Sequence, residues 1–272
     1  MSQTHTKDLN LTCQICSECG APKEYVLKGL GLPRKVPTAC KCDTRVYEQI
    51  KEQQDRADKM RKLDSLKKYS LMDTYFERCT FENWKIDETN KSWYKLGKRY
   101  CEQWQEMKKS NTGMLLYGAP GTGKSYLSFC IANELLKQYV PVIATSSINV
   151  INRIYESYSK YGDEGEVEIL NQFKNASLVI IDDLGAEHDG RTGKEKQIIY
   201  SLIDSRIRAN LPMIITTNLT PEQLKNKLTG SDGVARTYDR IVEACTQIEI
   251  TGKAYRIENA KEKLNILREL MR

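Results

Sequence analysis

The sequence predicts an α/β fold: a five-stranded parallel sheet preceded by a small cysteine-rich module and a linker helix. Apolar strand-like runs alternate with helical patterns after residue 112, which is typical of a parallel sheet. The loop after the first of these runs is rich in glycine, and a cluster of cysteines lies near the N-terminus. We expect two domains, residues 1–69 and residues 70–272.

The N-terminal module contains five of the nine cysteines within thirty residues. In a reducing compartment such a cluster indicates metal binding rather than disulfides, although free thiols are the alternative. Cys16 and Cys19, followed by a glycine, form one pair, and Cys40 and Cys42 form a second pair about twenty residues later. Four thiolates in two pairs can hold Zn²⁺ tetrahedrally. Cys13 is an alternate ligand, because it forms a second C-x₂-C pair with Cys16.

The segment from Thr44 to Tyr69 predicts a mostly exposed linker helix, because it has no Gly or Pro and only sparse apolar residues. Residues 21–70 hold thirteen Lys or Arg against seven Asp or Glu, which accounts for the net charge of +6. Such a basic arm can meet nucleic acid or an acidic protein surface, although a solvated helix has a similar composition. With only two histidines, His5 and His188, histidine-centred catalysis is not expected.

The second domain begins with several aromatic residues and a helix expected at Lys91–Lys109. The five expected strands are Met114–Tyr117, Pro141–Thr145, Leu178–Ile181, Met213–Thr217 and Thr246–Ile250. Between the second and third strands we expect a helix at Ile148–Tyr158 and a polar surface loop at residues 160–168. The remaining four cysteines are expected to be buried, with the last two inside helices: Cys79, Cys101, Cys130 and Cys245.

The sequence GAPGTGKS follows the first strand run and opens a helical pattern. It matches the G-x-x-x-x-G-K-[ST] pattern of a phosphate-binding loop, in the strand, loop and helix context that the pattern requires. Backbone N–H groups and the helix N-terminus would surround the phosphates of ATP. We expect Lys124 to reach the β and γ phosphates and the Ser125 hydroxyl to bind Mg²⁺. The loop residues expected to bind ATP are Gly118, Ala119, Pro120, Gly121, Thr122, Gly123, Lys124, Ser125 and Tyr126.

Polar residues at the ends of two later strands complete the predicted ATP site. Asp182 is expected to hold Mg²⁺ with the nucleotide, and Asp183 to orient the attacking water. Glutamate is usual at the second position in this class of ATPases, so hydrolysis is expected to be slow. Asn218 is expected to contact the γ-phosphate or the water, since ligands bind at the carboxyl ends of parallel strands; alternatively it caps the following helix. Glu187 is expected to be a solvated carboxylate.

With these motifs in place, the chain resembles the AAA+ family, specifically helicase loaders of the DnaC/DnaI type, over roughly residues 70–260. The segments that carry the resemblance are GAPGTGKSYL, VIIDDLGAE, IITTNLT and ARTYDRI. Arg236 and Arg240 lie four residues apart and share a helix face. By the resemblance, Arg240 matches the arginine finger that acts on a neighbouring subunit, and Arg256 matches the second nucleotide sensor. From the sequence alone, ion pairs with surface acids are the other interpretation.

The resemblance implies an ATP-dependent loader that docks on a hexameric DnaB-type replicative helicase and delivers it to single-stranded DNA. ATP hydrolysis would then act as a slow switch, with transient self-assembly through the arginine finger. Two alternatives stay open: a transposition helper ATPase of the IstB type, and a non-hydrolysing adaptor that only binds ATP.

Typical AAA+ proteins follow the fifth strand with a helical lid, whereas twenty-two residues follow Ile250 here, so no full lid domain is expected. No apolar run approaches the ~20 residues that span a bilayer, and the first ten residues lack a signal-peptide pattern. The sequence therefore predicts a cytoplasmic protein without a membrane partner.

Overall fold

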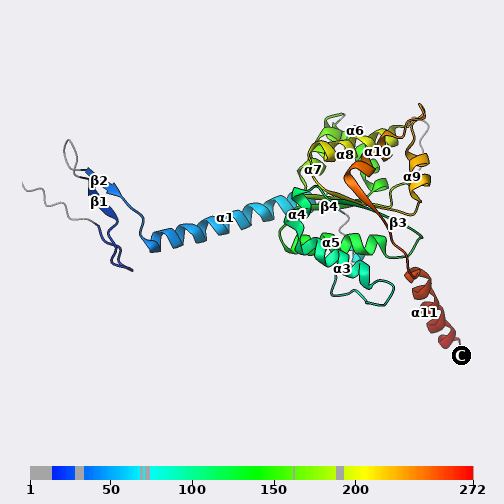
Figure 1. Cartoon of the computed structure of the whole chain (residues 1–272), viewed down its shortest axis with the longest axis horizontal. Coiled ribbons are helices and arrows are strands. Elements are labelled where there is room, and N and C mark those ends of the chain that lie inside the picture. The colour runs from blue at the N-terminus through cyan, green and yellow to red at the C-terminus, as the bar shows by residue number, and fades with distance from the viewer. Residues whose placement is uncertain are drawn as a thin grey trace, which may run out of the picture. The chain divides into compact units, whose positions relative to one another are not determined.

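The structure is a computed structural model that describes residues 14–27, 34–67, 70, 74–161, 163–187 and 193–271. The chain divides into two compact units, Met1–Asp58 and Lys59–Arg272, shown in Figure 1. Among the described residues, no helix combines the length and the apolar character needed to cross a membrane.

The first unit contains a short antiparallel hairpin and the start of a long helix. Strands β1 (Glu24–Leu27) and β2 (Arg34–Pro37) pair with each other. Helix α1 (Lys41–Lys67) follows, and its described side chains in the first unit are largely exposed, as expected for a segment with few apolar residues. The predicted linker helix is confirmed, with a start three residues earlier than Thr44. Lys68 and Tyr69, its predicted end, lie outside the described residues.

The second unit contains a five-stranded parallel sheet in the order β4-β5-β6-β3-β7. Its strands are β3 (Gly113–Tyr117), β4 (Val142–Ser146), β5 (Leu178–Asp182), β6 (Met213–Thr217) and β7 (Cys245–Glu249). Each predicted strand is confirmed to within one residue at both ends. Strands β3, β4, β5 and β6 are buried along almost their whole length, which explains their continuous apolar sequences.

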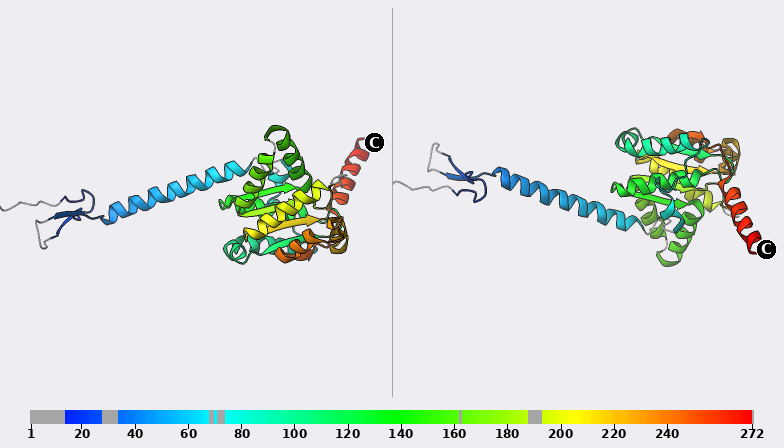
Figure 2. Two further views of the ribbon diagram at one scale, coloured as in Figure 1. Left: turned by 90° about the horizontal axis from the view of Figure 1, so that it is seen from above. Right: turned by 90° about the horizontal axis from the view of Figure 1, so that it is seen from below.

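Helices cover both faces of this sheet, as Figures 1 and 2 show. Helices α3 and α5 lie on one face, and α6, α7, α8 and α10 lie on the other. Side chains alternate between the two faces along each strand, so two hydrophobic clusters form. The helices are α2 (Thr74–Arg78), α3 (Lys91–Glu102), α4 (Trp104–Lys109), α5 (Lys124–Lys137), α6 (Ser147–Tyr161), α7 (Asp163–Asn175), α8 (Lys194–Arg208), α9 (Pro221–Leu228), α10 (Arg236–Ala244) and α11 (Tyr255–Leu270).

The predicted surface loop at residues 160–168 is wrong, because most of that segment is helical. Helix α6 continues to Tyr161, and α7 begins at Asp163. Ile169 and Phe173 of α7 are buried in one of the clusters, so tertiary packing stabilises a helix whose first turns are polar.

Two smaller predictions also need correction. The helix expected at Lys91–Lys109 is divided at Gln103 into α3 and α4. Cys245 is not inside a helix but begins β7, where its side chain is buried. The burial predicted for all four scattered cysteines is confirmed, and Cys130 lies inside α5 as expected.

Candidate nucleotide site and cysteine cluster

The phosphate-loop sequence connects the end of β3 to the start of α5. Gly118, Gly121 and Gly123 have φ values of 139°, 85° and 99°, a region that side-chain-bearing residues rarely adopt. A Cβ atom at Gly118 would lie 2.6 Å from the Ile250 carbonyl oxygen, so the loop packs against the segment after β7. The glycines therefore serve both the conformation of the loop and its close contact with a neighbouring segment.

Lys124 is the first residue of α5 and is folded over the loop that it closes. Its Nζ donates to the Gly118 and Ala119 carbonyl oxygens at 2.9 and 2.8 Å. The side chain is buried, and this burial lowers the pKa of Lys124, while the nearby Asp183 carboxylate acts in the opposite direction. An ammonium group held among carbonyl oxygens at a helix N-terminus is suited to binding phosphate.

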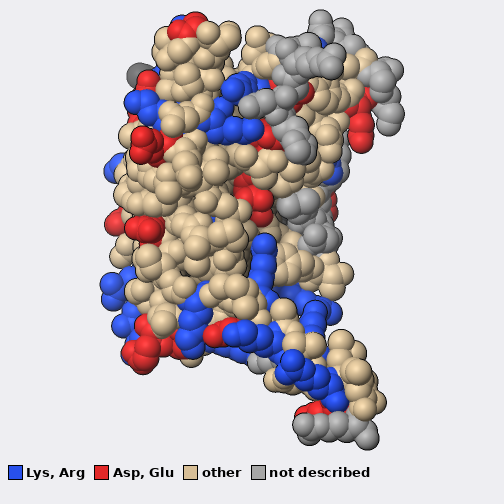
Figure 3. Space-filling view, turned by 90° about the vertical axis from the view of Figure 1, so that its right-hand side faces the viewer, with Lys and Arg blue, Asp and Glu red and all other residues tan. Residues whose placement is uncertain are grey.

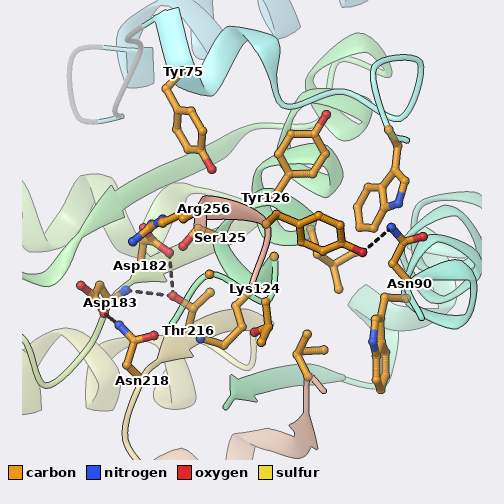
Figure 4. Close-up of a pocket in the computed structure, with 18 of the residues that line it drawn as sticks. Tyr75, Asn90, Lys124, Ser125, Tyr126, Asp182, Asp183, Thr216, Asn218 and Arg256 are labelled. Atoms are coloured by element: carbon orange, nitrogen blue, oxygen red, sulfur yellow. Dashed lines mark hydrogen bonds between the residues drawn. The ribbon is translucent and has the colours of Figure 1, made fainter. Parts of the chain in front are cut away.

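The carboxyl ends of β5 and β6 bring three predicted site residues together, as Figure 4 shows. Asn218 Nδ2 donates to Asp183 Oδ1 at 2.6 Å. Thr216 Oγ1 donates to Asp182 Oδ1 at 2.6 Å and accepts from the Asp183 backbone N–H at 2.9 Å. These bonds fix the directions of both carboxylates. Sequence reasoning did not identify Thr216, whose signal was its place one residue before the end of a strand.

Asp183 occupies an unusual environment for a carboxylate. Its φ of 55° lies in the left-handed region, which aspartate tolerates better than most residues and which turns the chain sharply after β5. Burial, together with the neighbouring Asp182 carboxylate, raises the pKa of Asp183. A carboxylate with a raised pKa beside a phosphate-binding lysine is typical of a functional site.

A cavity of about 580 Å³ joins the phosphate loop to these strand ends. Its size suits a nucleotide, since ligand pockets usually measure roughly 300–1,000 Å³. Ten of the predicted residues line it: Gly121, Thr122, Gly123, Lys124, Ser125, Tyr126, Asp182, Asp183, Asn218 and Arg256. The loop residues Gly118, Ala119 and Pro120 are not among its lining residues. Residues that sequence reasoning did not assign to the site also line it, among them Tyr75, Trp84, Asn90, Trp93 and Tyr255. The aromatic residues between 70 and 110 were the available signal, whereas nothing in the sequence pointed to Asn90.

The two arginines of α10 do not line this cavity. Arg236 and Arg240 lie beside a separate shallow pocket that also includes Tyr200. Arg240 Nη1 donates to Glu243 Oε2 at 2.9 Å, and its Nε lies 3.6 Å from Asp204 Oδ1. Its side chain is 37% exposed, so it remains accessible to a second molecule. The structure therefore separates Arg256, which is near the phosphate loop, from Arg240, which is not.

One expectation and one alternative interpretation about neighbouring residues are wrong. Glu187 is buried rather than solvated, because its Oε2 accepts from Ser147 Oγ at 2.8 Å and from the Gly185 N–H at 2.9 Å. Asn218 is not the cap of α9, since Thr220 fills that position in a capping box with Gln223. The Asn218 side chain is consequently available for the site.

The first unit brings together the four cysteines proposed as zinc ligands. The sulfur atoms of Cys16, Cys19, Cys40 and Cys42 all lie within 4.8 Å of one another. Tetrahedral zinc with Zn–S distances of about 2.3 Å would require similar separations. The four thiols therefore fit a zinc ion. Cys13, the alternate ligand, lies outside the described residues.

The turn that presents the first cysteine pair is itself well ordered by backbone bonds. The Gly20 N–H donates to the Cys16 carbonyl at 2.9 Å, and the Cys16 N–H donates to the Ala21 carbonyl at 2.8 Å. Gly20 has a φ of 69°, which agrees with the tight turn inferred from the glycine after Cys19. At the second pair, the Asp43 carboxylate accepts from the Cys40 N–H at 3.3 Å and pairs with Lys23 at 3.0 Å.

The order of the strands agrees with the AAA+ class that the sequence predicts. β6 lies between β3, which leads into the phosphate loop, and β5, which ends in the two aspartates. Asn218 is thereby inserted between the phosphate loop and the acidic pair, in the arrangement of the AAA+ class. The second unit is accordingly an ATP-binding P-loop core of the AAA+ class.

Comparison with known proteins gives the family. Residues 45–263 match the family described as IstB-like ATP binding protein, and the chain belongs to this family. It is similar to the replicative helicase loader DnaC of Escherichia coli (strain K12), with 28% identity over 61% of this chain and 63% of DnaC. The match thus spans less than two thirds of DnaC.

Two further comparisons involve DnaI. The chain is 26% identical to the replicative helicase loader DnaI of Bacillus subtilis (strain 168), over 89% of this chain and 77% of DnaI. A solved structure entitled "Crystal Structure of the DnaI" superposes with a TM-score of 0.54 and 26% identity, covering 68% of this chain and 94% of that one. The chain is therefore homologous to the DnaC/DnaI helicase loaders.

Proposed function

We propose that the protein is an ATP-dependent loader, which docks on a hexameric DnaB-type replicative helicase and delivers it to single-stranded DNA. The observation that carries the proposal is the combination of an AAA+ nucleotide site with homology to two replicative helicase loaders. ATP binding and slow hydrolysis would switch the loader between a state that holds the helicase and one that releases it.

In this proposal the phosphate loop binds ATP. Lys124 contacts the β and γ phosphates, and Ser125 and Asp182 hold Mg²⁺, which neutralises phosphate charge when it is bound. Asp183 accepts a hydrogen bond from the attacking water and directs it, and Asn218 keeps that carboxylate oriented through their 2.6 Å bond. Support comes from the position of these side chains around one cavity.

Arg256 and Arg240 would act on the ATP of different molecules. Arg256 lines the cavity and contributes positive charge near the phosphates of its own ATP. Arg240 lines a different pocket and would contact the ATP of a neighbouring copy, as an arginine finger does. Its pairing with Glu243 and Asp204 would have to open during such assembly.

Residues 1–69 would form the helicase-binding domain, with zinc held by Cys16, Cys19, Cys40 and Cys42. The described part of this region exposes several large apolar side chains. The exposed apolar side chains include Ile15, Tyr25, Leu27, Val46, Tyr47 and Ile50. Exposed apolar residues in such number favour a protein partner over a solvated tail.

Single-stranded DNA is the second proposed partner. Figure 3 shows Lys and Arg side chains gathered on the lower part of the face that it views. Helix α11 carries the exposed residues Lys261, Lys263 and Arg268. Because bound DNA phosphates release counterions, the affinity for DNA should fall steeply as salt is added.

The test is a loading assay with the partner helicase, single-stranded DNA and ATP, in which unwinding by the loaded helicase is measured. The wild-type protein should stimulate loading, and Lys124→Ala should abolish both ATP binding and stimulation. Lys137→Ala is the matched control, because this lysine lies at the other end of α5 and pairs with Glu82 and Glu134 on the surface. Normal loading by Lys124→Ala would rule out an ATP-dependent loader.

Two alternatives have specific support. The family name points to a transposition helper of the IstB type, and stimulation of a transposase in place of a helicase would favour it. Aspartate at position 183 favours an adaptor that binds ATP without hydrolysing it. Equal steady-state hydrolysis by the wild type and Asp183→Ala would favour that adaptor.

A further inference from the structure

Tyr255 connects three parts of the nucleotide site that lie far apart in the sequence. It is the first residue of α11, and its backbone N–H donates to the Gly121 carbonyl of the phosphate loop at 3.1 Å. Its side chain lines the nucleotide cavity. The next residue is Arg256, which lines the same cavity and lies beside Asp182 in Figure 4. A substitution at Tyr255 can therefore affect the conformation of both the phosphate loop and Arg256.

The Tyr255 hydroxyl is held by two side chains from the segment before α3, and a third, the Thr89 hydroxyl, lies 3.3 Å from it. It accepts from Asn90 Nδ2 at 2.8 Å, the bond drawn at Asn90 in Figure 4, and donates to Asp87 Oδ2 at 2.9 Å. Asn90 is only 6% exposed, and its Nδ2 also donates to the Lys85 carbonyl at 2.9 Å. The tyrosine hydroxyl therefore uses both its donor and its acceptor capacity within the wall of the cavity.

The Asp87 carboxylate, which accepts from the Tyr255 hydroxyl, is also held in place by hydrogen bonds. Asp87 Oδ1 accepts from the Thr89 N–H, the Thr89 hydroxyl and the Asn90 N–H at 2.8, 2.6 and 3.0 Å. These hydrogen bonds, with the Thr89 hydroxyl first, hold the pKa of Asp87 near 2, so the group is an anion at neutral pH. Trp93 Nε1 adds a bond to the Thr251 carbonyl at 3.2 Å, which ties the same two segments together a second time.

We infer that Tyr255 is a positioning residue that holds Arg256 toward the terminal phosphate, through the hydrogen bonds of its hydroxyl to Asn90 and Asp87. The inference rests on the proposed role of Arg256 as the sensor of its own ATP. Arg256 is at the start of a helix with many exposed apolar residues, whose described part is anchored chiefly at this end. Without the hydroxyl, the Tyr255 N–H bond to the Gly121 carbonyl is the hydrogen bond that, among the described contacts, still joins the first turn of α11 to the phosphate loop.

The inference predicts an effect on the discrimination between ATP and ADP, because only ATP carries the terminal phosphate. Tyr255→Phe keeps the ring and the backbone bond to Gly121 but removes the hydroxyl with its contacts to Asn90, Asp87 and Thr89. We expect this substitution to weaken the binding of a non-hydrolysable ATP analogue by about fivefold, which is the scale of one net hydrogen bond. The binding of ADP should weaken by less than about twofold. Calorimetric titration with each nucleotide and Mg²⁺ measures both affinities. Tyr155→Phe is the control, since it removes a hydroxyl bond to Glu195 elsewhere.

A double-mutant cycle distinguishes positioning from an independent contribution. Arg256→Ala should lower the ratio of ATP to ADP affinity, and adding Tyr255→Phe to it should change that ratio no further. Asn90→Ala, which breaks the network from its other side, should reproduce the effect of Tyr255→Phe. Thermal melting of each variant establishes that it is folded under the titration conditions.

Three results would overturn the inference: equal weakening of both nucleotides by Tyr255→Phe, multiplicative effects in the cycle, or an unchanged ratio in Arg256→Ala. The last result would also remove the sensor role of Arg256. None of them depends on a helicase or on hydrolysis. Failure of the loader proposal would appear separately, as normal helicase loading by Lys124→Ala.

Discussion

Asn218 and Asp183 show how one hydrogen bond at the end of a strand can set the direction of a carboxylate. The bond from Asn218 Nδ2 to Asp183 Oδ1 measures 2.6 Å, and Asp183 lies on a sharp left-handed turn. Among the described contacts, this is the hydrogen bond that the Asp183 side chain makes. Its direction therefore depends on the amide that β6 delivers beside it.

Asn218→Ala should slow steady-state ATP hydrolysis about tenfold or more and leave ATP affinity within about twofold of wild type, because positioning acts on the reaction and not on binding. Single-turnover hydrolysis and calorimetric titration separate the two quantities. Asn226→Ala, an exposed amide in α9, is the control. An unchanged hydrolysis rate in Asn218→Ala would show that Asp183 needs no such partner.

Arg206 is a second residue with a role set by its hydrogen bonds. Its side chain is completely buried, and its guanidinium donates to four carbonyls, those of Phe173, Ala176, Ser177 and Pro212. Burial lowers the pKa of Arg206 to about 9, which still leaves it protonated at neutral pH. It thereby ties the end of α8 to the segments that precede β5 and β6.

Arg206→Met should reduce the free energy of unfolding by more than about 3 kcal/mol, because it leaves several buried carbonyl oxygens without donors. Urea denaturation measures the change. Arg208→Met provides the comparison, since this arginine, two residues later in α8, is 74% exposed and pairs only with Asp204 among the described contacts. The free energy of unfolding of Arg208→Met should fall by at most about 1 kcal/mol. Similar losses for both variants would contradict a structural role for the carbonyl bonds.

At the scale of elements, α9 has the most complete helix start among the described residues. Thr220 Oγ1 accepts from the Gln223 N–H at 3.2 Å, the Gln223 side chain accepts from the Thr220 N–H at 2.9 Å, and Pro221 occupies the first turn. This start lies two residues after Asn218. The cap therefore ends the β6 segment at a defined place and keeps the amide outside the helix.

Thr220→Ala should destabilise the protein by about 1 kcal/mol, the usual contribution of a threonine cap. Chemical denaturation followed by circular dichroism measures it. Thr229→Ala, at the opposite end of α9, removes a bond to the Lys225 carbonyl and should have a smaller effect. If Thr229→Ala proved the more damaging change, the cap would not be what holds this helix.

The strands and the phosphate loop could be predicted from the sequence because their signals are local. A buried parallel strand needs a continuous apolar run, and the phosphate loop needs glycines and a lysine at fixed spacing. The start of α7 gave no such signal, since its first turns are polar and its stability comes from Ile169 and Phe173. With so few apolar positions, the 3.6-residue pattern of a helix cannot be distinguished from the irregular pattern of a loop.

The aromatic wall of the nucleotide cavity could not be assigned for a different reason. Trp84 and Asn90 come from a segment before the sheet, and Tyr255 follows its last strand. The Tyr255 hydroxyl contacts Asn90 and Asp87, which lie 165 and 168 positions before it, and no local pattern reveals such a pairing. Glu187 was misjudged for the same reason, because the hydroxyl that donates to its carboxylate belongs to Ser147, forty positions earlier at the start of α6.

At the scale of the whole molecule, the two units depend on different sources of stability. Both hydrophobic clusters among the described residues are drawn from residues after 75, in the second unit. In the described part of the first unit, Cys16 and Cys40 are the buried apolar residues. A unit of this kind cannot be held by a hydrophobic core, so metal binding would supply most of its folding free energy.

Removal of zinc should therefore unfold the first unit and leave the second intact. The purified protein should contain about one zinc ion per chain. After treatment with a strong chelator, amide protection at β1 and β2 should be lost, while ATP affinity and the unfolding midpoint of the second unit should stay unchanged. Helicase binding should disappear with the metal if the first unit is the docking domain.

Single cysteine variants identify the ligands. Cys19→Ser should lose the metal, because its sulfur lies within 4.8 Å of the other three thiols, whereas Cys130→Ala, buried in α5, should keep it. Cys13→Ser should also keep the metal if the ligands are the four cysteines that the structure brings together. Loss of zinc from Cys13→Ser would instead place Cys13 among the ligands, and one member of the proposed set would then be spare. Metal content measured on each purified variant decides between these two ligand sets.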